Sequence, residues 1–222
     1  MTKKQWFWRI TLYAIGITIL SFGVSLCAKA GYGISGVTSL PYGIANAFGL
    51  NFSRTVLVTY IIMVGLQFVV RGKNRQWRDL FQIPFSVVFS SFLDWFESLL
   101  TFPLDFMWQK LVLLVIALLC MGIGVSLTVN PNFVPNPPDG LTQALSVRFK
   151  ISMGLTKNLM DFTCVGLTVL VDLLFIGRLF SVGFGTVCCM IFIGRIIAVF
   201  DYFCKDKMLE MMGLAPKEEA KK

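Results

Sequence analysis

The tetrapeptide Gly-Val-Ser-Leu ends two apolar segments of the chain, at residues 23–26 and again at residues 124–127. Each time an irregular leg follows, rich in glycine in the first case and in proline and asparagine in the second. A short, weakly polar segment and two further apolar segments come after each leg. The order of span, leg, short helix, span and span therefore predicts an internal duplication, with repeat one at about 9–100 and repeat two at about 109–204.

The composition indicates that the apolar segments of this pattern lie in a membrane. Of the 222 residues, 56% are hydrophobic and only 14% are charged, too few charges to cover the surface of a soluble domain. The apolar runs are continuous and approach the roughly 20 residues that a helix needs to cross a bilayer. We expect a single domain, an all-α polytopic membrane protein, with a polar tail at 205–222. The expected spans are 10–28, 54–70, 82–100, 109–129, 155–176 and 181–204.

The ionisable residues exclude several classes of function. The chain contains no histidine, its six cysteines show no CxxC spacing, and no cofactor or ATP-binding motif is present. We therefore expect no metal, no cofactor and no enzymatic activity. The net charge of +8 gathers at the ends of the spans, where it sets orientation and contacts anionic lipid rather than nucleic acid.

The basic loops decide whether the short segments 36–49 and 139–150 cross the membrane. If neither crosses, both termini, residues 71–78 and residues 148–157 face the cytoplasm, as the positive-inside rule requires. If segment 36–49 crosses, the basic cluster at 71–78 is placed outside. The rule therefore favours six spans and two re-entrant segments. Each repeat then holds three spans, an odd number, so the two repeats are inverted relative to each other.

The legs are long enough to bring the two short helices together. Seven extended residues (29–35) reach about 23 Å, and a helix of fourteen residues is about 21 Å long. Both lengths exceed half of a hydrocarbon core that is about 30 Å thick. The N-termini of the short helices should then meet near the midplane, where irregular backbone must line a polar cavity. Inverted repeats with broken helices of this kind form the binding sites of secondary transporters.

Polar residues on the legs and charged residues within the spans are the candidates for binding a solute. Lys29 either contacts an anion or snorkels to the outer surface. Asp94 and Arg195 lie in corresponding spans, and either pair across the repeat interface or bind solute or a proton. Asp139 either caps a short helix or binds the solute. The candidate binding residues are Lys29, Tyr32, Ser35, Gly36, Thr38, Asn130, Asp139, Gly140, Thr142, Asp94 and Arg195.

Three further expectations concern acidic and small residues. Asp161 and Asp172 lie near the two ends of one span, and Asp172 is expected at the membrane interface. Glycines in the first and fourth apolar segments are expected to let helices approach closely. These glycines are Gly16, Gly23, Gly122 and Gly124.

At the breaks the chain resembles the YczE/YitT-like family of small bacterial membrane proteins. Gly23-Val24-Ser25-Leu26 before the first leg and Pro138-Asp139-Gly140-Leu141 in the second carry the resemblance, which extends over most of residues 10–204. Relatives of the YczE type tend to have a Pro-Trp-Asp-like element in the first leg, where this chain reads Gly33-Ile34-Ser35-Gly36, so it resembles a divergent member. The resemblance implies a multi-pass protein of the bacterial inner membrane.

Three functions fit these features. The first is a secondary carrier for a small polar or anionic solute, driven by an ion gradient. The second is a passive channel, because two half-helices that meet at the midplane also suit a pore. The third is a membrane partner or assembly factor that transports nothing. The expected partners are the lipid bilayer, an unknown small solute and, for a homodimer, a second copy of the chain.

Overall fold

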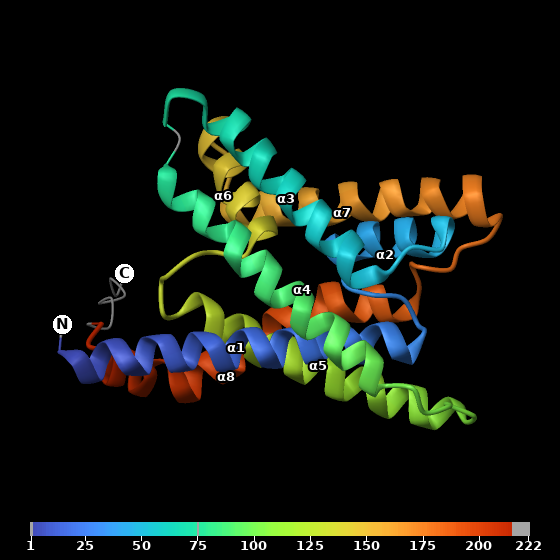
Figure 1. Cartoon of the computed structure of the whole chain (residues 1–222), viewed down its shortest axis with the longest axis horizontal. Helices are drawn as coiled ribbons and strands as arrows, with labels where there is room; N and C mark the ends of the chain where they lie inside the picture. Colours follow the sequence, from blue (N-terminus) through green and yellow to red (C-terminus); the bar gives the residue numbers. More distant parts are fainter. Residues whose placement is uncertain (1, 75, 215–222) are drawn as a thin grey trace.

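The computed structural model describes residues 2–74 and 76–214, and every regular element within these ranges is a helix (Figure 1). The α-helices are α1 (Lys3–Ala30), α2 (Gly36–Phe48), α3 (Phe52–Arg71), α4 (Gln82–Leu99), α5 (Met107–Val129), α6 (Pro137–Phe149), α7 (Met153–Val171) and α8 (Phe184–Met212). Short 3₁₀ segments at Gly72–Asn74 and Trp77–Phe81 join α3 to α4, and a π-helical segment, Asp172–Ile176, extends α7. The all-α prediction is confirmed.

Five of the described helices are long and apolar enough to cross a membrane, namely α1, α3, α5, α7 with its π-helical extension, and α8. The sequence predicts a sixth span at 82–100, where the structure has α4. This helix does not meet the same criterion. Asp94, Glu97 and four serines lower its mean hydropathy, although its length of 18 residues is close to that of a span.

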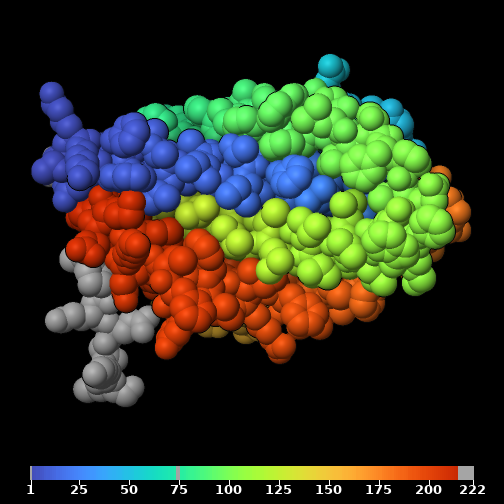
Figure 2. Space-filling model, turned by 90° about the horizontal axis from the view of Figure 1, so that it is seen from below, coloured from blue at the N-terminus to red at the C-terminus, as the bar shows by residue number. Residues whose placement is uncertain are grey.

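Helices α1 and α5 pack against each other along one side of the molecule and run in opposite directions (Figure 1). A Cβ atom added to Gly16 would lie 2.9 Å from atoms of Leu127, and one added to Gly23 would lie 2.8 Å from the backbone nitrogen of Met121. Gly124 faces Leu20 of α1 equally closely. The glycines therefore bring the two helices together, as expected, because any side chain would hold them apart. The face that α1 and α5 share with α8 is seen in Figure 2.

The two short helices lie where the sequence predicts them, and each packs against a long helix from the other half of the chain. Helix α2 lies along α7, whereas α6 lies along α3 (Figure 1). Buried hydroxyls contribute to the first contact, since Ser39 Oγ lies 2.9 Å from Thr168 Oγ1. The halves of the sequence are therefore interleaved rather than packed as separate units.

Both legs are shorter than the sequence predicts. Helix α1 continues through Lys29 and Ala30 and ends only at Gly31, whose φ of 72° is the left-handed conformation that glycine adopts at helix ends. The first leg is therefore residues 31–35 rather than 29–35. The second leg ends early as well, because α6 begins at Pro137. Proline is tolerated in the first turn, where the N–H that it lacks would have no partner in the helix.

The C-terminal helix is longer than predicted. The polar tail is predicted to start at residue 205, but α8 continues to Met212. Met208, Leu209 and Met212 are buried, and they cluster with Leu127 of α5 and Trp8 of α1. This apolar stripe keeps residues 205–212 helical against the bundle despite their charges. Residues 215–222 of the predicted tail lie outside the described residues.

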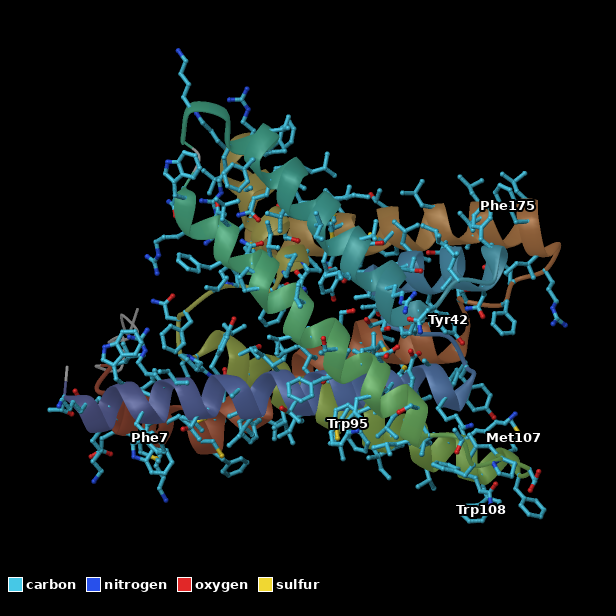
Figure 3. All side chains as sticks on the ribbon, viewed as in Figure 1. Phe7, Tyr42, Trp95, Met107, Trp108 and Phe175 are labelled. Carbon is cyan, nitrogen blue, oxygen red and sulfur yellow. The ribbon has the colours of Figure 1, made fainter. Side chains whose placement is uncertain are left out.

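Exposed aromatic side chains lie at opposite ends of the α1–α5 pair. Phe7, near the start of α1, and Trp108, near the start of α5, point away from the bundle at the two ends of its long axis (Figure 3). Phe175, at the end of α7, lies toward the same end as Trp108. Aromatic residues concentrate at both interfaces of a bilayer, so this arrangement is consistent with a membrane normal along the long helices.

Candidate functional site

A cavity of about 250 Å³ lies where the two short helices begin. Ser35, Gly36 and Thr38 line it from the start of α2, and Asn136 and Asp139 line it from the start of α6. The other helices supply mainly apolar walls, among them Leu20, Val24, Tyr60, Phe89, Met121, Val125 and Ile193. The first turn of a helix carries free N–H donors and partial positive charge, so the polar groups of this cavity gather at two helix N-termini.

An ion pair connects the start of α6 to α7 at the cavity wall. Lys157 Nζ lies 2.7 Å from Asp139 Oδ1, and both residues line the cavity. The Lys157 side chain is 49% exposed and that of Asp139 is 24% exposed, so neither charge is sealed in the protein interior. A pair of this kind can exchange partners, because breaking it leaves both groups within reach of a solute or of water.

A second carboxylate faces the start of α2. Asp161, one turn after Lys157 on α7, interacts with the backbone N–H of Val37 in the first turn of α2. A Cβ atom at Gly36 would lie 2.7 Å from Asp161 Oδ1, so only glycine leaves room for this approach. The carboxylate compensates the positive end of α2 in the way an N-terminal acidic residue does, but it comes from another helix.

The structure gathers four of the predicted binding residues at this cavity, namely Ser35, Gly36, Thr38 and Asp139. Gly140 and Thr142 lie directly behind it on α6, where Thr142 Oγ1 donates a hydrogen bond of 2.7 Å to the carbonyl oxygen of Pro138. The structure also changes the expected cap of α6. The capping position is held by Asn136, and Asp139 lies within the first turn.

The other predicted residues lie elsewhere. Lys29 Nζ is 5.3 Å from the centre of the Phe102 ring, beyond the cavity at the end of α1. The carbonyl oxygen of Tyr32 accepts a hydrogen bond from the N–H of Gly185. Asn130 donates to Asp201 and so connects the end of α5 to α8. These contacts hold helices and legs together.

The predicted alternative of an ion pair between Asp94 and Arg195 is wrong. Asp94 Oδ1 accepts hydrogen bonds from Asn51 and Ser53, which fix the start of α3 against α4. Arg195 lies on the outer side of α8, near the ring of Phe192.

Asp172, predicted at the membrane interface, is fully buried within the protein. Its carboxylate accepts hydrogen bonds from the backbone N–H groups of Phe180 and Ser181 and from the Ser181 hydroxyl. Three donors offset the cost of burying the charge. Asp172 thus holds the loop between α7 and α8 in place.

Sequence reasoning missed part of the cavity wall. Lys157 was assigned only to a basic loop, and Asn136, Asn158 and Tyr60 were not singled out for binding. A spacing pattern on α7 could have revealed Lys157. Lys157 and Asp161 are four residues apart, followed on the same face by the buried residues Cys164 and Thr168. A polar stripe on one face of a spanning helix is typical of a face that lines a cavity.

Comparisons with known proteins give a family without an assigned activity. Residues 7–202 match a family described as a family of unknown function, DUF6198. The chain is 25% identical over 196 residues to the uncharacterized membrane protein YczE of Bacillus subtilis strain 168, covering 88% of this chain and 86% of that protein. It is 27% identical over 191 residues to the uncharacterized protein YyaS of the same strain, covering 85% and 90%. No solved structure matches the chain.

The comparisons confirm the resemblance to YczE that the residues at the breaks predict. The name of that relative describes a membrane protein, and the described part of this chain has five helices that are long and apolar enough to cross a membrane. The chain is therefore a multi-pass membrane protein.

Proposed function

The chain belongs to the DUF6198 family, and on that premise we propose that it is a secondary carrier for a small polar solute. One observation carries the proposal. Two short helices, one from each half of the sequence, begin at the same cavity and contribute polar groups to it. Carriers built from inverted repeats place their binding sites at such broken helices.

Reciprocal contacts between α1 and α5 support the inverted repeat. Gly23 packs against Met121, and Gly124 packs against Leu20. A rotation that exchanges residue 23 with 124 also exchanges 20 with 121, so each contact is the image of the other. The packing of α2 on α7 and of α6 on α3 follows the same exchange. A two-fold axis in the membrane plane, passing through the α1–α5 contact, accounts for all four contacts.

The legs are compatible with re-entrant helices although they are shorter than predicted. Five residues (31–35) reach about 17 Å and seven (130–136) about 23 Å when extended. Each distance exceeds half of a hydrocarbon core about 30 Å thick. With the basic loop at 71–78 in the cytoplasm, α2 would return to the outer face and α6 to the inner face of the bacterial plasma membrane, and both termini would be cytoplasmic.

The charges of the cavity favour a solute that carries groups of both signs. Lys157 offers a cation to a carboxylate or phosphate, and Asp161 offers an anion to an ammonium group or a coupling cation. The hydroxyls of Ser35 and Thr38, 2.7 Å apart, add donors and acceptors. A solute that binds here would replace Asp139 as the partner of Lys157. Such replacement would couple binding to movement of α6 relative to α7.

Reconstitution into proteoliposomes tests the proposal. Thermal-shift screening of the purified protein against amino acids and other small zwitterions would select a solute, and its uptake would then be measured. A carrier gives saturable uptake that unlabelled solute on the opposite side accelerates by counterflow. Asp161→Asn should abolish the saturable flux, while Asp105→Asn in the α4–α5 loop should leave it intact.

Two outcomes would contradict the carrier. Flux that rises linearly with concentration and shows no counterflow would instead support the channel alternative. Wild-type protein that moves none of the solutes that stabilise it would support a binding or assembly role.

A further inference from the structure

Two glutamines are completely buried next to the start of α6. Gln67 of α3 and Gln82 at the start of α4 each expose 0% of their surface. None of their four side-chain oxygen and nitrogen atoms has a hydrogen-bond partner within the described part of the chain. A buried polar group left unpaired has lost its hydrogen bonds to water without replacement, which destabilises the folded state. Two such amides side by side are therefore unusual unless water or a ligand satisfies them.

Both amides face the backbone of one glycine. A Cβ atom at Gly140 would lie 2.6 Å from Gln67 Oε1 and 2.6 Å from Gln82 Nε2. The two side chains and Gly140 thus form one polar level where α3, α4 and α6 meet, which we call the glutamine level. Any side chain at position 140 would fill the space in front of the amides.

The glutamine level lies between two cavities. Tyr60 of α3, Phe89 of α4 and Asp139 of α6 line the central cavity on one side of it. On the other side, Arg71 of α3 and Gln143 of α6 line a second cavity of about 390 Å³. On α3 and α6 the residues of the glutamine level come between these positions in sequence. We call the contact region of α3, α4 and α6 between the two cavities the seam.

The corresponding level in the other half of the molecule is fully bonded. When the two repeats are aligned, Thr168 corresponds to Gln67 and Ser181 corresponds to Gln82. Thr168 Oγ1 donates to the carbonyl oxygen of Cys164 at 2.7 Å, and Ser181 Oγ donates to Asp172 at 2.9 Å. The hydroxyls of Thr168 and Ser181 are therefore hydrogen-bonded within the protein. The amides of Gln67 and Gln82 have no such partner among the described residues.

We infer that the seam between α3, α4 and α6 is the route by which a hydrated polar solute passes between the central cavity and the basic end of the molecule. The inference rests on the proposed carrier function and adds to it the path and its narrowest point. The amides of Gln67 and Gln82 supply donors and acceptors in place of the water that the solute loses. At the basic end, Arg71 closes the seam through contacts to Asp79 at 3.4 Å and to Gln143 at 3.2 Å.

Thiol accessibility tests the route without any knowledge of the solute. Gln67→Cys and Gln82→Cys are each introduced into a chain whose six native cysteines are replaced by alanine. A membrane-impermeant methanethiosulfonate reagent is then added to inside-out and to right-side-out vesicles. The matched control is Val56→Cys, also fully buried on α3 but at an apolar position. Size-exclusion profiles of the purified variants show which of them fold.

Thiols at 67 and 82 should react from the side that carries Arg71 about a hundredfold faster than the thiol at 56, because an apolar buried position is reached only through local opening. Rates no higher than that at position 56 would overturn the route and leave the carrier proposal standing.

In the wild-type background, Gly140→Ala should abolish uptake, while Gly65→Ala, whose Cβ would meet open space, should not. Full uptake by Gly140→Ala would likewise overturn the route.

Different experimental results contradict the carrier proposal and the proposed solute route. If the thiols react as expected but the wild-type protein shows no saturable flux, the carrier proposal is wrong, and the solute route is overturned with it.

Discussion

Lys157 Nζ lies 2.7 Å from Asp139 Oδ1 and so joins the middle of the second repeat to the first turn of its short helix. Both residues also line the cavity at which α2 begins. The pair is therefore the one ionic contact within the described residues that both stabilises a short helix and faces the proposed binding site.

Removing one partner of this pair should affect transport more than stability. Because Lys157 is half exposed, the pair contributes only about 0.2–1 kcal/mol to the free energy of unfolding. Asp139→Asn should therefore shift the melting temperature of the purified protein slightly, yet lower uptake strongly by changing the charge of the cavity. The exchanged double variant, Asp139→Lys with Lys157→Asp, should recover little of the uptake, and its stability should stay below that of the wild type because a lysine in the first turn opposes the positive end of α6. Unchanged uptake by the Asp139→Asn variant would show that the ion pair is not part of the binding site.

The contact between Gly36 and Asp161 should tolerate no added methyl group. In Gly36→Ala the new Cβ would lie 2.7 Å from Asp161 Oδ1, so the carboxylate must leave the start of α2. Loss of a favourable charge at a helix N-terminus costs about 0.3–1 kcal/mol, and up to about 2 kcal/mol where the site is partly buried. Thermal unfolding in detergent measures this cost. Gly166→Ala on α7, where a Cβ meets open space, is the matched control, and an equal loss in both variants would contradict the contact.

The α1–α5 contact should be the most sensitive packing site of the fold. Gly23→Leu and Gly124→Leu each place a large side chain against the backbone of the opposite helix. Overpacking of this kind typically costs about 1–3 kcal/mol, and here it meets backbone that cannot turn aside. Because the two contacts are images of each other, the two variants should lose similar stability. Gly65→Leu should lose little. A large loss in only one of the two would argue against the two-fold relation.

The sequence predicts the helices well because their signals are local. Apolar length is enough to identify the long helices, but not their ends, since α1 begins at Lys3 rather than residue 10 and α8 continues to Met212 rather than ending at 204. The site is predicted only in part. Ser35, Gly36, Thr38 and Asp139 follow from their places at the helix starts.

The role of Lys157 depends on how α7 is rotated about its axis, which packing against α2 and α6 determines. For Asp94 and Arg195, in contrast, the sequence predicts a contact that the structure does not contain. Their positions within apolar segments suggest a pair, but Asp94 bonds to Asn51 at the start of α3 and Arg195 lies beside Phe192 of its own helix. Charges within a span therefore identify candidates, and only the tertiary arrangement assigns their partners.

The central claim is that α2 and α6 enter from opposite faces of the membrane and return to the faces from which they came. The loop after each short helix tests it most directly, through Leu50→Cys after α2 and Lys150→Cys after α6, both at exposed positions. In a background without native cysteines, an impermeant thiol reagent should label position 50 only from the periplasmic side and position 150 only from the cytoplasmic side. Labelling of both positions from the same side would contradict the inverted arrangement.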